Sequence, residues 1–494
     1  MVRVNPKIKD RIFVSFFLIF LFSPFLILFL SLPFEVSFSR VLDFGSSWNA
    51  LKNSFWLACG ASVCSLSLGV LGSLGLLSKM GKPSLKIHSF VYLLPNLMPH
   101  LLIVIAAINA IEIFTEFPYG FVGIFIIETM MLSGVVSLSF FNSIKDKMGD
   151  ILILPIIEGA SFSQVFFKGV LGYLKRDLLQ LFLFVFSITF TSFSVPFLVG
   201  KNLLTLEVLI YELIRVKNEW THALLLTGVE ILFLLLLGLL LKKPKAEHRP
   251  SNKYLSSMGK KYGLWPSWML LLFLVLGLFR NFGSGIKKLL EDRLFLAYLL
   301  DGLRGSFLIG FSTGVLTLFF LAVLLFIQPG RFLKKLLQGY VAPSSILTGF
   351  ALLLVPRMWL LVDWVKISLG LSLISVPILY RLYFATHFDS LFDQVQVART
   401  LGASKSQVFW KITGPQFLNS FGFMAGLASF WAVGDFALSG VIATRDFTLA
   451  LIIKNLIATY RLDMATVVVW VLLLCGALCL FVFKGLSYVF SKKY

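Results

Sequence analysis

Charged residues are scarce in this chain of 494 residues. They make up 14% of the sequence, whereas hydrophobic residues make up 58% and the mean hydropathy is +0.90. The core of a soluble domain does not hold so large an apolar share. The composition therefore excludes an ordinary soluble globular protein and predicts a polytopic membrane protein.

Acidic residues are especially few, because 24 Asp and Glu stand against 44 Lys and Arg, a formal net charge of +20. The basic residues cluster in short loops between apolar segments and are not interleaved with aromatic residues. The positive-inside rule accounts for this distribution, so we expect no nucleic-acid partner. By the same rule the basic amino terminus, the central linker and the carboxyl terminus are predicted to lie in the cytoplasm.

Cysteine is rare as well. The four cysteines all fall within long apolar segments, at spacings that suit helix packing better than a disulfide or a metal cage. We therefore expect no metal site. The cysteines are Cys59, Cys64, Cys475 and Cys479.

No nucleotide-binding motif occurs in the chain. The nearest approach to a phosphate-binding loop, Gly75 to Gly81-Lys82, has one residue too many and a proline after the lysine. The chain is therefore expected to hydrolyse nothing itself and to hold no cofactor. No small-x-small cleavage site follows the first apolar segment, which is predicted to be an uncleaved anchor.

Long apolar runs, in contrast, are abundant. A helix that crosses a bilayer needs about 20 mostly apolar residues. The runs predict an all-α polytopic membrane protein of about twelve transmembrane helices, six in each half. The predicted spans lie near 11–33, 50–78, 88–111, 118–142, 178–200, 221–241, 263–282, 301–328, 340–361, 366–386, 418–441 and 465–489.

A ten-residue phrase that occurs twice indicates that the two halves are repeats. Residues 159–168 read GASFSQVFFK and residues 402–411 read GASKSQVFWK. The same offset pairs Thr205-Leu206 with Thr448-Leu449, and a slightly larger one pairs LKNSF at 51–55 with LRGSF at 303–307. Three landmarks in the same order favour duplication of one membrane unit.

Because each half has an even number of predicted spans, the repeats are expected to be parallel rather than inverted. The first repeat is predicted at 1–245, with a cytoplasmic loop at about 145–177. A basic cytoplasmic linker at 246–262 precedes the second repeat at 263–494, whose cytoplasmic loop lies at about 388–417.

Each copy of the phrase predicts a helix, a corner made by glycine, and a second short helix that begins with a capping box. The residues that carry this prediction are Leu391, Val395 and Ala398 on one helical face, Gly402 at the corner, Ser404 with Gln407 as one capping box, and Ser161 with Gln164 as the other.

The second short helix carries Phe166-Phe167 in the first copy and Phe409-Trp410 in the second. A rigid helical projection with aromatic residues is suited to docking a partner. The alternative is an amphipathic helix that lies on the bilayer surface. Duplication of detailed sequence, and not merely of amphipathicity, favours docking.

The second loop resembles the cytoplasmic Glu-Ala-Ala loop of ATP-binding-cassette importer permeases. In that family Glu-Ala-Ala is followed by three residues, Gly, nine residues, Ile, one residue and Leu-Pro. This spacing is matched by residues 396–398 (QVA), Gly402, Ile412 and Pro415. Three identities differ, with Gln396 in place of Glu, Val397 in place of the first Ala and Gly414 in place of Leu. The first loop is more degenerate, with ILP at 153–155, which predicts that the two loops couple with unequal strength.

Within that family the fused twelve-span arrangement is most similar to the thiamine and ferric-iron importer permeases. The segments that look most like the thiamine branch are Phe190-Thr191-Ser192-Phe193, Thr205-Leu206-Glu207, Gly434-Asp435, Thr448-Leu449 and Tyr460-Arg461-Leu462-Asp463. The resemblance implies a type I importer permease that moves thiamine, a related small cation or, alternatively, ferric iron by alternating access. It implies a multi-pass protein of a bacterial inner (plasma) membrane, with both termini cytoplasmic.

The resemblance also implies partners. Two copies of a separate ABC ATPase would bind the cytoplasmic loops, a periplasmic or extracellular solute-binding protein would deliver substrate, and membrane lipid would surround the spans. The coupling residues that it implies are Gly159, Ala160, Ser161, Gln164, Phe166 and Phe167 in the first loop, and Gln396, Ala398, Gly402, Ala403, Ser404, Gln407, Phe409, Trp410 and Pro415 in the second.

Ionisable residues at membrane depth are a second kind of candidate, because they cost about 2.5–3.5 kcal/mol on insertion scales and mark function or helix pairing. They are Glu128, Glu230, Arg357 and Asp435, with Asp363 near an interface. Each one pairs two helices, lies at the membrane interface or lines a pathway. Gly434 favours the second role for Asp435, since it permits a break in the helix.

Two functions of other classes remain open at this point. A proton- or sodium-coupled secondary transporter also has room for twelve spans in two parallel halves. It would need ionisable groups at the midplane, but it would have no reason to duplicate a capped cytoplasmic projection. A membrane scaffold or sensor would show no substrate flux.

Overall fold

The computed structural model describes residues 6–31, 44–148, 158–161, 164–240, 261–327, 334, 337, 344–355, 362–445 and 447–491. Every regular element among them is a helix. The predicted all-α class is therefore confirmed for the described part of the chain.

The first half contains four helices of 21 residues or more and several shorter ones. In chain order these are α1 (Pro6–Leu30), α3 (Phe44–Leu77), α4 (Ser84–Leu97), α5 (His100–Ile111), α6 (Phe121–Met148), the π-helix η1 (Val165–Leu171), α9 (Lys175–Phe190), α10 (Ser194–Val199), α11 (Leu206–Arg215) and α12 (Trp220–Leu240).

The second half follows a similar order. Its elements are η2 (Lys261–Leu264), α14 (Trp265–Phe279), α15 (Phe282–Glu291), α16 (Arg293–Ile327), α18 (Ser345–Leu354), α19 (Asp363–Leu379), η3 (Tyr380–Phe384), α20 (Ala385–Ser390), α21 (Phe392–Thr400), α22 (Lys405–Val408), η4 (Phe409–Thr413), α23 (Gly414–Val433), α24 (Ala437–Ile442), α25 (Leu449–Ala458) and α26 (Leu462–Ser491).

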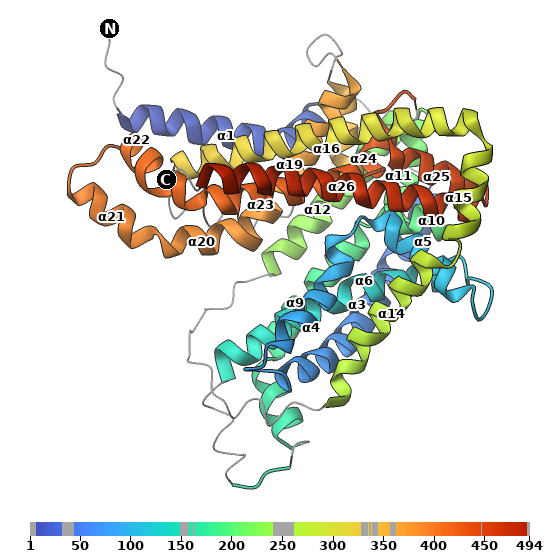
Figure 1. The fold of residues 1–494 in the computed structure, drawn as a ribbon, viewed down its shortest axis with the longest axis horizontal. Coiled ribbons are helices and arrows are strands. Elements are labelled where there is room, and N and C mark those ends of the chain that lie inside the picture. Colours follow the sequence, from blue (N-terminus) through green and yellow to red (C-terminus); the bar gives the residue numbers. More distant parts are fainter. Residues whose placement is uncertain are drawn as a thin grey trace.

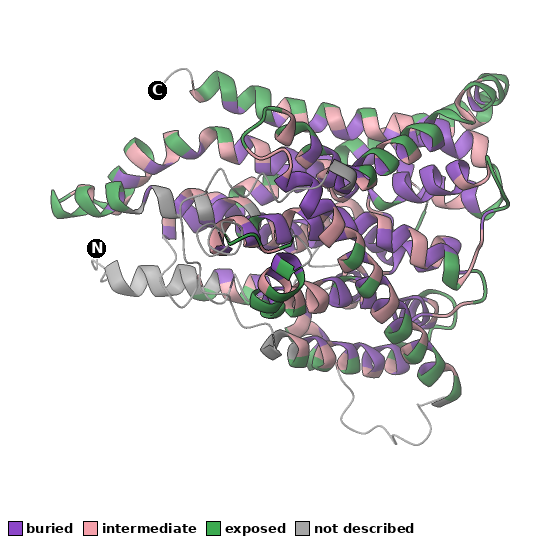
Figure 2. Cartoon of the chain, turned by 90° about the horizontal axis from the view of Figure 1, so that it is seen from below, coloured by how far each residue is buried: buried purple, intermediate pink, exposed green. Residues whose placement is uncertain are grey.

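Five helical stretches in the described residues are long and apolar enough to cross a membrane: Gly45–Leu77, Phe121–Met148, Trp265–Glu291, Arg293–Ile327 and Leu462–Ser491. A sixth span results if α4 and α5, which meet at an angle of 104°, count as one bent span. These stretches make the chain a polytopic membrane protein. Figure 2 shows its buried residues in the interior and exposed residues along the outer faces.

The other predicted spans are shorter or interrupted in the structure. The segment predicted at 178–200 divides after Phe190 into α9 and α10, and the one at 418–441 divides after Val433 into α23 and α24. Of the predicted span 340–361, the structure describes only residues 344–355. Hydropathy misses these breaks because apolar residues continue across them.

Side chains satisfy the backbone where the second of these helices breaks. Asp435 Oδ2 accepts a hydrogen bond from the amide of Leu438 at 3.0 Å, and Ser439 Oγ donates to the carbonyl of Asp435 at 3.0 Å. A helix can end within a membrane only where such partners replace the missing backbone bonds. The break is therefore a stable corner.

The helices form two bundles that lie close together at one end and diverge toward the other (Figure 1). One bundle is built on α3, α6 and α9, and the other on α16, α19, α23 and α26. The projecting helices α20, α21 and α22 lie at the far end of the second bundle, whereas α15, α10 and α25 lie at the end where the bundles meet.

Each half contributes its first helix to the bundle of the other half. In α1, Phe20 stacks on Phe320 of α16 with ring centroids 4.0 Å apart. In α14, Gly277 lies against the carbonyl of Ala106 in α5, an approach that a larger residue would block. This exchange makes the two halves one packed unit.

The duplicated sequence landmarks contact one another in the structure. Ser54 Oγ accepts a hydrogen bond from the amide of Leu206 at 2.8 Å, and Ser306 Oγ accepts one from the amide of Leu449 at 2.8 Å. Both serines are buried. Each therefore caps the first turn of a ten-residue helix, α11 or α25, from a distant part of the chain.

Replacing Ser54 or Ser306 by alanine leaves a buried amide without this partner. We expect each change to lower the free energy of unfolding by about 1 kcal/mol, seen as a lower thermal unfolding midpoint of the purified chain in detergent. Ser67→Ala is the matched control, since the exposed Ser67 hydroxyl bonds only the carbonyl of Val63 in its own helix. An equal drop in the control would contradict the capping role.

Candidate functional site

The second loop, predicted at about 388–417, has the helix, corner and capped helix that its sequence predicts. The α21 helix ends at Thr400, and Gly402 follows with a φ of +86°, which favours glycine. Ser404 Oγ accepts from the amide of Gln407 at 3.3 Å, and Gln407 Oε1 accepts from the amide of Ser404 at 2.8 Å. The predicted capping box is confirmed.

The first loop repeats this corner. Gly159 has a φ of +78°. Ser161 Oγ accepts from the amide of Gln164 at 3.3 Å, and Gln164 Oε1 accepts from the amide of Ser161 at 3.0 Å. Half-buried Ala160 lies between glycine and serine, as Ala403 does in the second loop. The segment 153–155 lies outside the described residues.

Each loop pairs an inward aromatic ring with an outward one. Phe166 is buried and Phe167 is 64% exposed, while Phe409 is half-buried and Trp410 is 69% exposed. The rings of each pair are nearly perpendicular, with centroids 5.5 Å and 5.1 Å apart. Leu401, at the second corner, is 83% exposed. These exposed apolar side chains make the two loops candidate interaction surfaces.

The second loop is braced against the bundle. The ring of Phe409 contacts that of Phe326 in α16 with centroids 5.6 Å apart. Gln416 Nε2 in α23 donates to Gln394 Oε1 in α21 at 3.0 Å. A movement of this loop would therefore be transmitted directly to α16 and α23.

The remaining predicted residues of this loop lie where the motif puts them. Gln396 is exposed on α21, Ala398 is half-buried on the face that also carries the buried Leu391 and Val395, and Pro415 lies in the first turn of α23. The predicted apolar face of the loop helix is thus confirmed.

The ionisable candidates differ in their surroundings. Glu128 is buried and accepts a hydrogen bond from Ser192 Oγ at 2.5 Å, so it joins α6 to the break after α9. Asp435 caps α24 and also accepts from Ser345 Oγ at 3.4 Å. Asp363 accepts from the hydroxyl of Thr444 at 3.0 Å. Arg357 lies outside the described residues.

Glu230 has a different environment, because it faces a second buried glutamate, Glu207 of α11. The hydroxyl of Ser344 lies beside Glu207. Within the described residues, none of the four carboxyl oxygens of Glu207 and Glu230 has a partner in hydrogen-bond geometry. This pair contrasts with Glu128 and Asp435, whose oxygens have partners.

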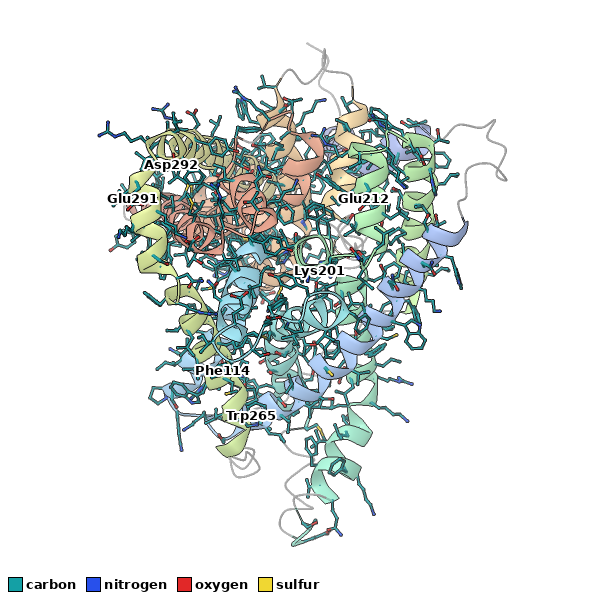
Figure 3. The ribbon with its side chains drawn as sticks, turned by 90° about the vertical axis from the view of Figure 1, so that its right-hand side faces the viewer. Phe114, Lys201, Glu212, Trp265, Glu291 and Asp292 are labelled. Atoms are coloured by element: carbon teal, nitrogen blue, oxygen red, sulfur yellow. The ribbon has the colours of Figure 1, made fainter. Side chains whose placement is uncertain are left out.

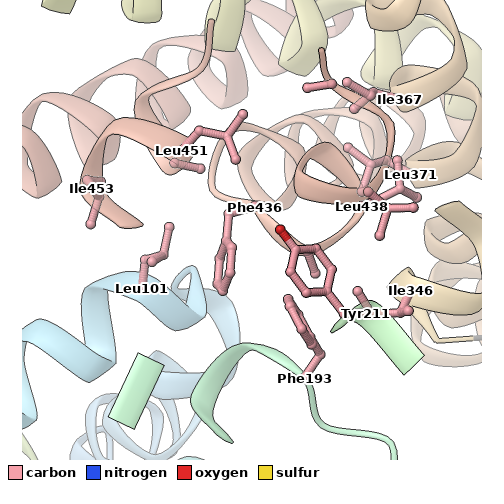
Figure 4. Packing of buried hydrophobic residues seen from close by; sticks show 14 of the residues in the cluster. Leu101, Phe193, Tyr211, Ile346, Ile367, Leu371, Phe436, Leu438, Leu451 and Ile453 are labelled. Atoms are coloured by element: carbon pink, nitrogen blue, oxygen red, sulfur yellow. The ribbon is translucent and has the colours of Figure 1, made fainter. Parts of the chain in front are cut away.

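Aromatic rings from both halves meet between the bundles. Phe193, Phe197 and Tyr211 of the first half contact each other. Phe193 and Phe197 also contact Phe436 of the second half, and the Phe193 and Phe436 centroids are 5.6 Å apart. Figure 4 shows Phe193, Tyr211 and Phe436 turned toward one another. We call these four residues the central ring cluster.

Lys454 of α25 also contacts the central ring cluster. Its Nζ lies 5.2 Å from the ring centroid of Phe197 and donates to Tyr211 Oη at 3.4 Å. The contact pairs Phe193–Phe436 and Tyr211–Lys454 both have the offset of 243 residues that relates the duplicated phrase. Residues at this common sequence offset therefore contact each other at the centre of the molecule.

Sequence analysis overlooked Glu207, Tyr211 and Lys454 as site residues. A signal was present for Lys454, the one charged residue of the otherwise apolar run 449–458. Glu207 follows the duplicated Thr-Leu landmark directly. Nothing local distinguishes Tyr211, whose importance comes from its neighbours.

The end of the molecule away from the loops faces the viewer in Figure 3 and carries Lys201, Glu212, Glu291 and Asp292. An ion pair joins Lys288 of α15 to Asp463 of α26, beside a cavity that Glu291 and Asp292 also line. A second cavity is lined by Lys201 and Glu212, among others. Both cavities are candidates for contact with an external partner.

One tyrosine at this end has a shifted pKa. Burial, followed by the negative charges of Glu112 and Tyr460, raises the pKa of Tyr119. Lys201 Nζ lies 4.6 Å from the centroid of the same ring. The Tyr119 phenol is therefore neutral, and its ring packs against the Lys201 ammonium group.

No family model, no curated protein and no solved structure matches this chain. Its class therefore rests on its own architecture, which is that of an all-helical, polytopic, membrane-embedded protein. The features that distinguish it within that class are the two capped loops and the centre where the halves meet.

Removing the cap of the second loop should loosen only that loop. In Ser404→Ala we expect the amides of 407–413 to exchange hydrogen about five-fold faster, the equivalent of about 1 kcal/mol, measured by mass spectrometry of the purified chain. Ser406→Ala, an exposed serine of the same helix, is the control. Equal exchange in the two variants would contradict a stabilising cap.

Proposed function

We propose that the chain is the permease subunit of an ATP-driven, binding-protein-dependent importer. The observation that carries this proposal is the pair of projections, each with a glycine corner at positive φ, a reciprocal Ser–Gln cap and one outward aromatic ring. A rigid surface that occurs twice on one chain suits two copies of one partner.

The proposal includes a duplicated, parallel architecture of about twelve spans. Equal lengths and the common offset of 243 residues relate α10 to α24 and α11 to α25. The serine caps from α3 and α16 and the exchanged helices α1 and α14 support the same symmetry. Under this proposal, short helices that replace continuous spans are the reason that fewer than twelve described helices are long enough to cross a membrane alone.

In the proposed mechanism, two ABC ATPase subunits bind the loops around Gly159 and Gly402. Their ATP-driven closure draws together the diverging ends of the bundles seen in Figure 1, and the opposite ends part. The permease itself supplies positioning and a path, while the partner subunits hydrolyse ATP. A solute-binding protein delivers cargo at the end that Figure 3 displays.

The proposed cargo is thiamine or a related small cationic solute, carried into the cytoplasm across a bacterial inner membrane, with both termini of the chain cytoplasmic. The buried carboxyl groups of Glu207 and Glu230 and the half-buried one of Asp435 suit a cation. Ferric iron is the alternative cargo, since carboxylates bind it as well.

Co-purification tests the importer proposal. The intact chain is purified in mild detergent beside Gly402→Trp and Trp410→Ala, and accompanying polypeptides are quantified by mass spectrometry. We expect a nucleotide-binding ATPase at about two copies per wild-type chain, and about half or less with either variant, because an exposed aromatic anchor carries much of an interface's affinity.

Trp48→Ala is the matched control. Trp48 is 63% exposed, nearly as much as Trp410, but it lies in the first turn of α3, at the opposite end of that helix from the first loop. Loss of the ATPase from this variant would show a general effect of removing surface tryptophan. Absence of any ATPase from the folded wild type would overturn the proposal and favour ion-coupled transport.

A further inference from the structure

The unpartnered glutamate pair must either hold a proton or have a positive charge beside it. Glu207 and Glu230 are each 1% exposed, and their carboxyl groups face each other, with the Ser344 hydroxyl beside Glu207. Two carboxylates so placed repel each other and lack the hydrogen bonds that would replace water. A cation beside them would remove both penalties.

The pair adjoins the central ring cluster. Glu207 and Tyr211 are four residues apart on α11, so they share one face of that helix. The ring of Tyr211 lies 5.1 Å from that of Phe193 and 5.2 Å from that of Phe197. Carboxylates beside several aromatic faces are the combination that recognises organic cations, because rings attract positive charge without acting as metal ligands.

A cation already lies against these rings. Lys454 Nζ is 5.2 Å and 5.7 Å from the centroids of Phe197 and Tyr211. Within the described part of the chain, Lys454 forms no ion pair with a carboxylate. Its ammonium group therefore shows that the cluster accepts a positive charge, independently of the glutamate pair.

We propose that Glu207, Glu230 and the central ring cluster form one binding site for an organic cation, and that Lys454 occupies the aromatic side of this site as a tethered competitor. This inference rests on the proposed importer function and assigns its cargo a place. Cargo binding requires Lys454 to leave the rings. Because Lys454 and Tyr211 belong to different halves, that displacement also breaks a contact between the halves.

Binding to the purified chain alone tests the site without the ATPase. Radiolabelled thiamine is the probe, with tetraethylammonium as an unlabelled competitor. We expect Lys454→Met to bind thiamine about three-fold more tightly, because the competing ammonium is gone. We expect Glu207→Gln and Glu230→Gln each to bind about tenfold more weakly, because a charged contact is lost.

Glu128→Gln is the matched control, since Glu128 is equally buried but has the Ser192 hydroxyl as its partner. Its thiamine affinity should stay within two-fold of the wild type, and Lys454→Arg should also resemble the wild type because it keeps the positive charge. Size-exclusion profiles and thermal midpoints establish that each variant is folded. If a glutamine variant does not fold, the proposal is decided by whether Lys454→Met binds thiamine more tightly or more weakly than the wild type.

Three results would overturn the proposal. They are weaker thiamine binding by Lys454→Met, equal effects of Glu207→Gln and Glu128→Gln, and binding of Na⁺ or Fe³⁺ that depends on Glu207 while thiamine does not bind. Any of them leaves the importer proposal intact if the ATPase still co-purifies. Thiamine binding that follows the expected pattern without a co-purifying ATPase would instead keep the site and refute the importer.

Discussion

Backbone groups inside a membrane must find hydrogen-bond partners within the protein, and the centre of this molecule depends on that constraint. Its short helices α10, α11, α24 and α25 end and begin where no bilayer water can serve them. Ser54 and Ser306 satisfy the first turns of α11 and α25, and Asp435 satisfies that of α24. These caps allow the two halves to meet through helix ends and aromatic rings.

Polar side chains at membrane depth serve two different purposes here. Asn109 shows the structural one, since its amide donates to the carbonyl of Gly277 and to Thr466 Oγ1, and its Oδ1 accepts from Asn281. It therefore ties α5 to α14 and α26. Glu207 and Glu230 have no such satisfied network. The carboxyl groups of Glu128 and Asp435 do have partners, and this contrast is the physical basis for the cargo site that we propose at the pair.

Much of the structure of the two capped loops could be predicted from sequence because it is local. A Ser–Gln capping box forms between residues three apart, and a glycine at positive φ needs no distant contact. The breaks after Phe190 and Val433 could not be found by hydropathy, because the residues on both sides of each break are apolar. The bent α4–α5 pair was predicted as a single span for the same reason.

The sequence by itself determined the membrane class, the local form of both loops and the duplicated landmarks, since composition and contacts over three or four residues do not depend on the rest of the fold. The tertiary structure alone decided that Ser54 reaches Leu206, that Glu207 faces Glu230 and that Tyr211 meets Lys454. These contacts join residues tens to hundreds of positions apart. They exist only because helix packing brings distant, individually unremarkable side chains to one place.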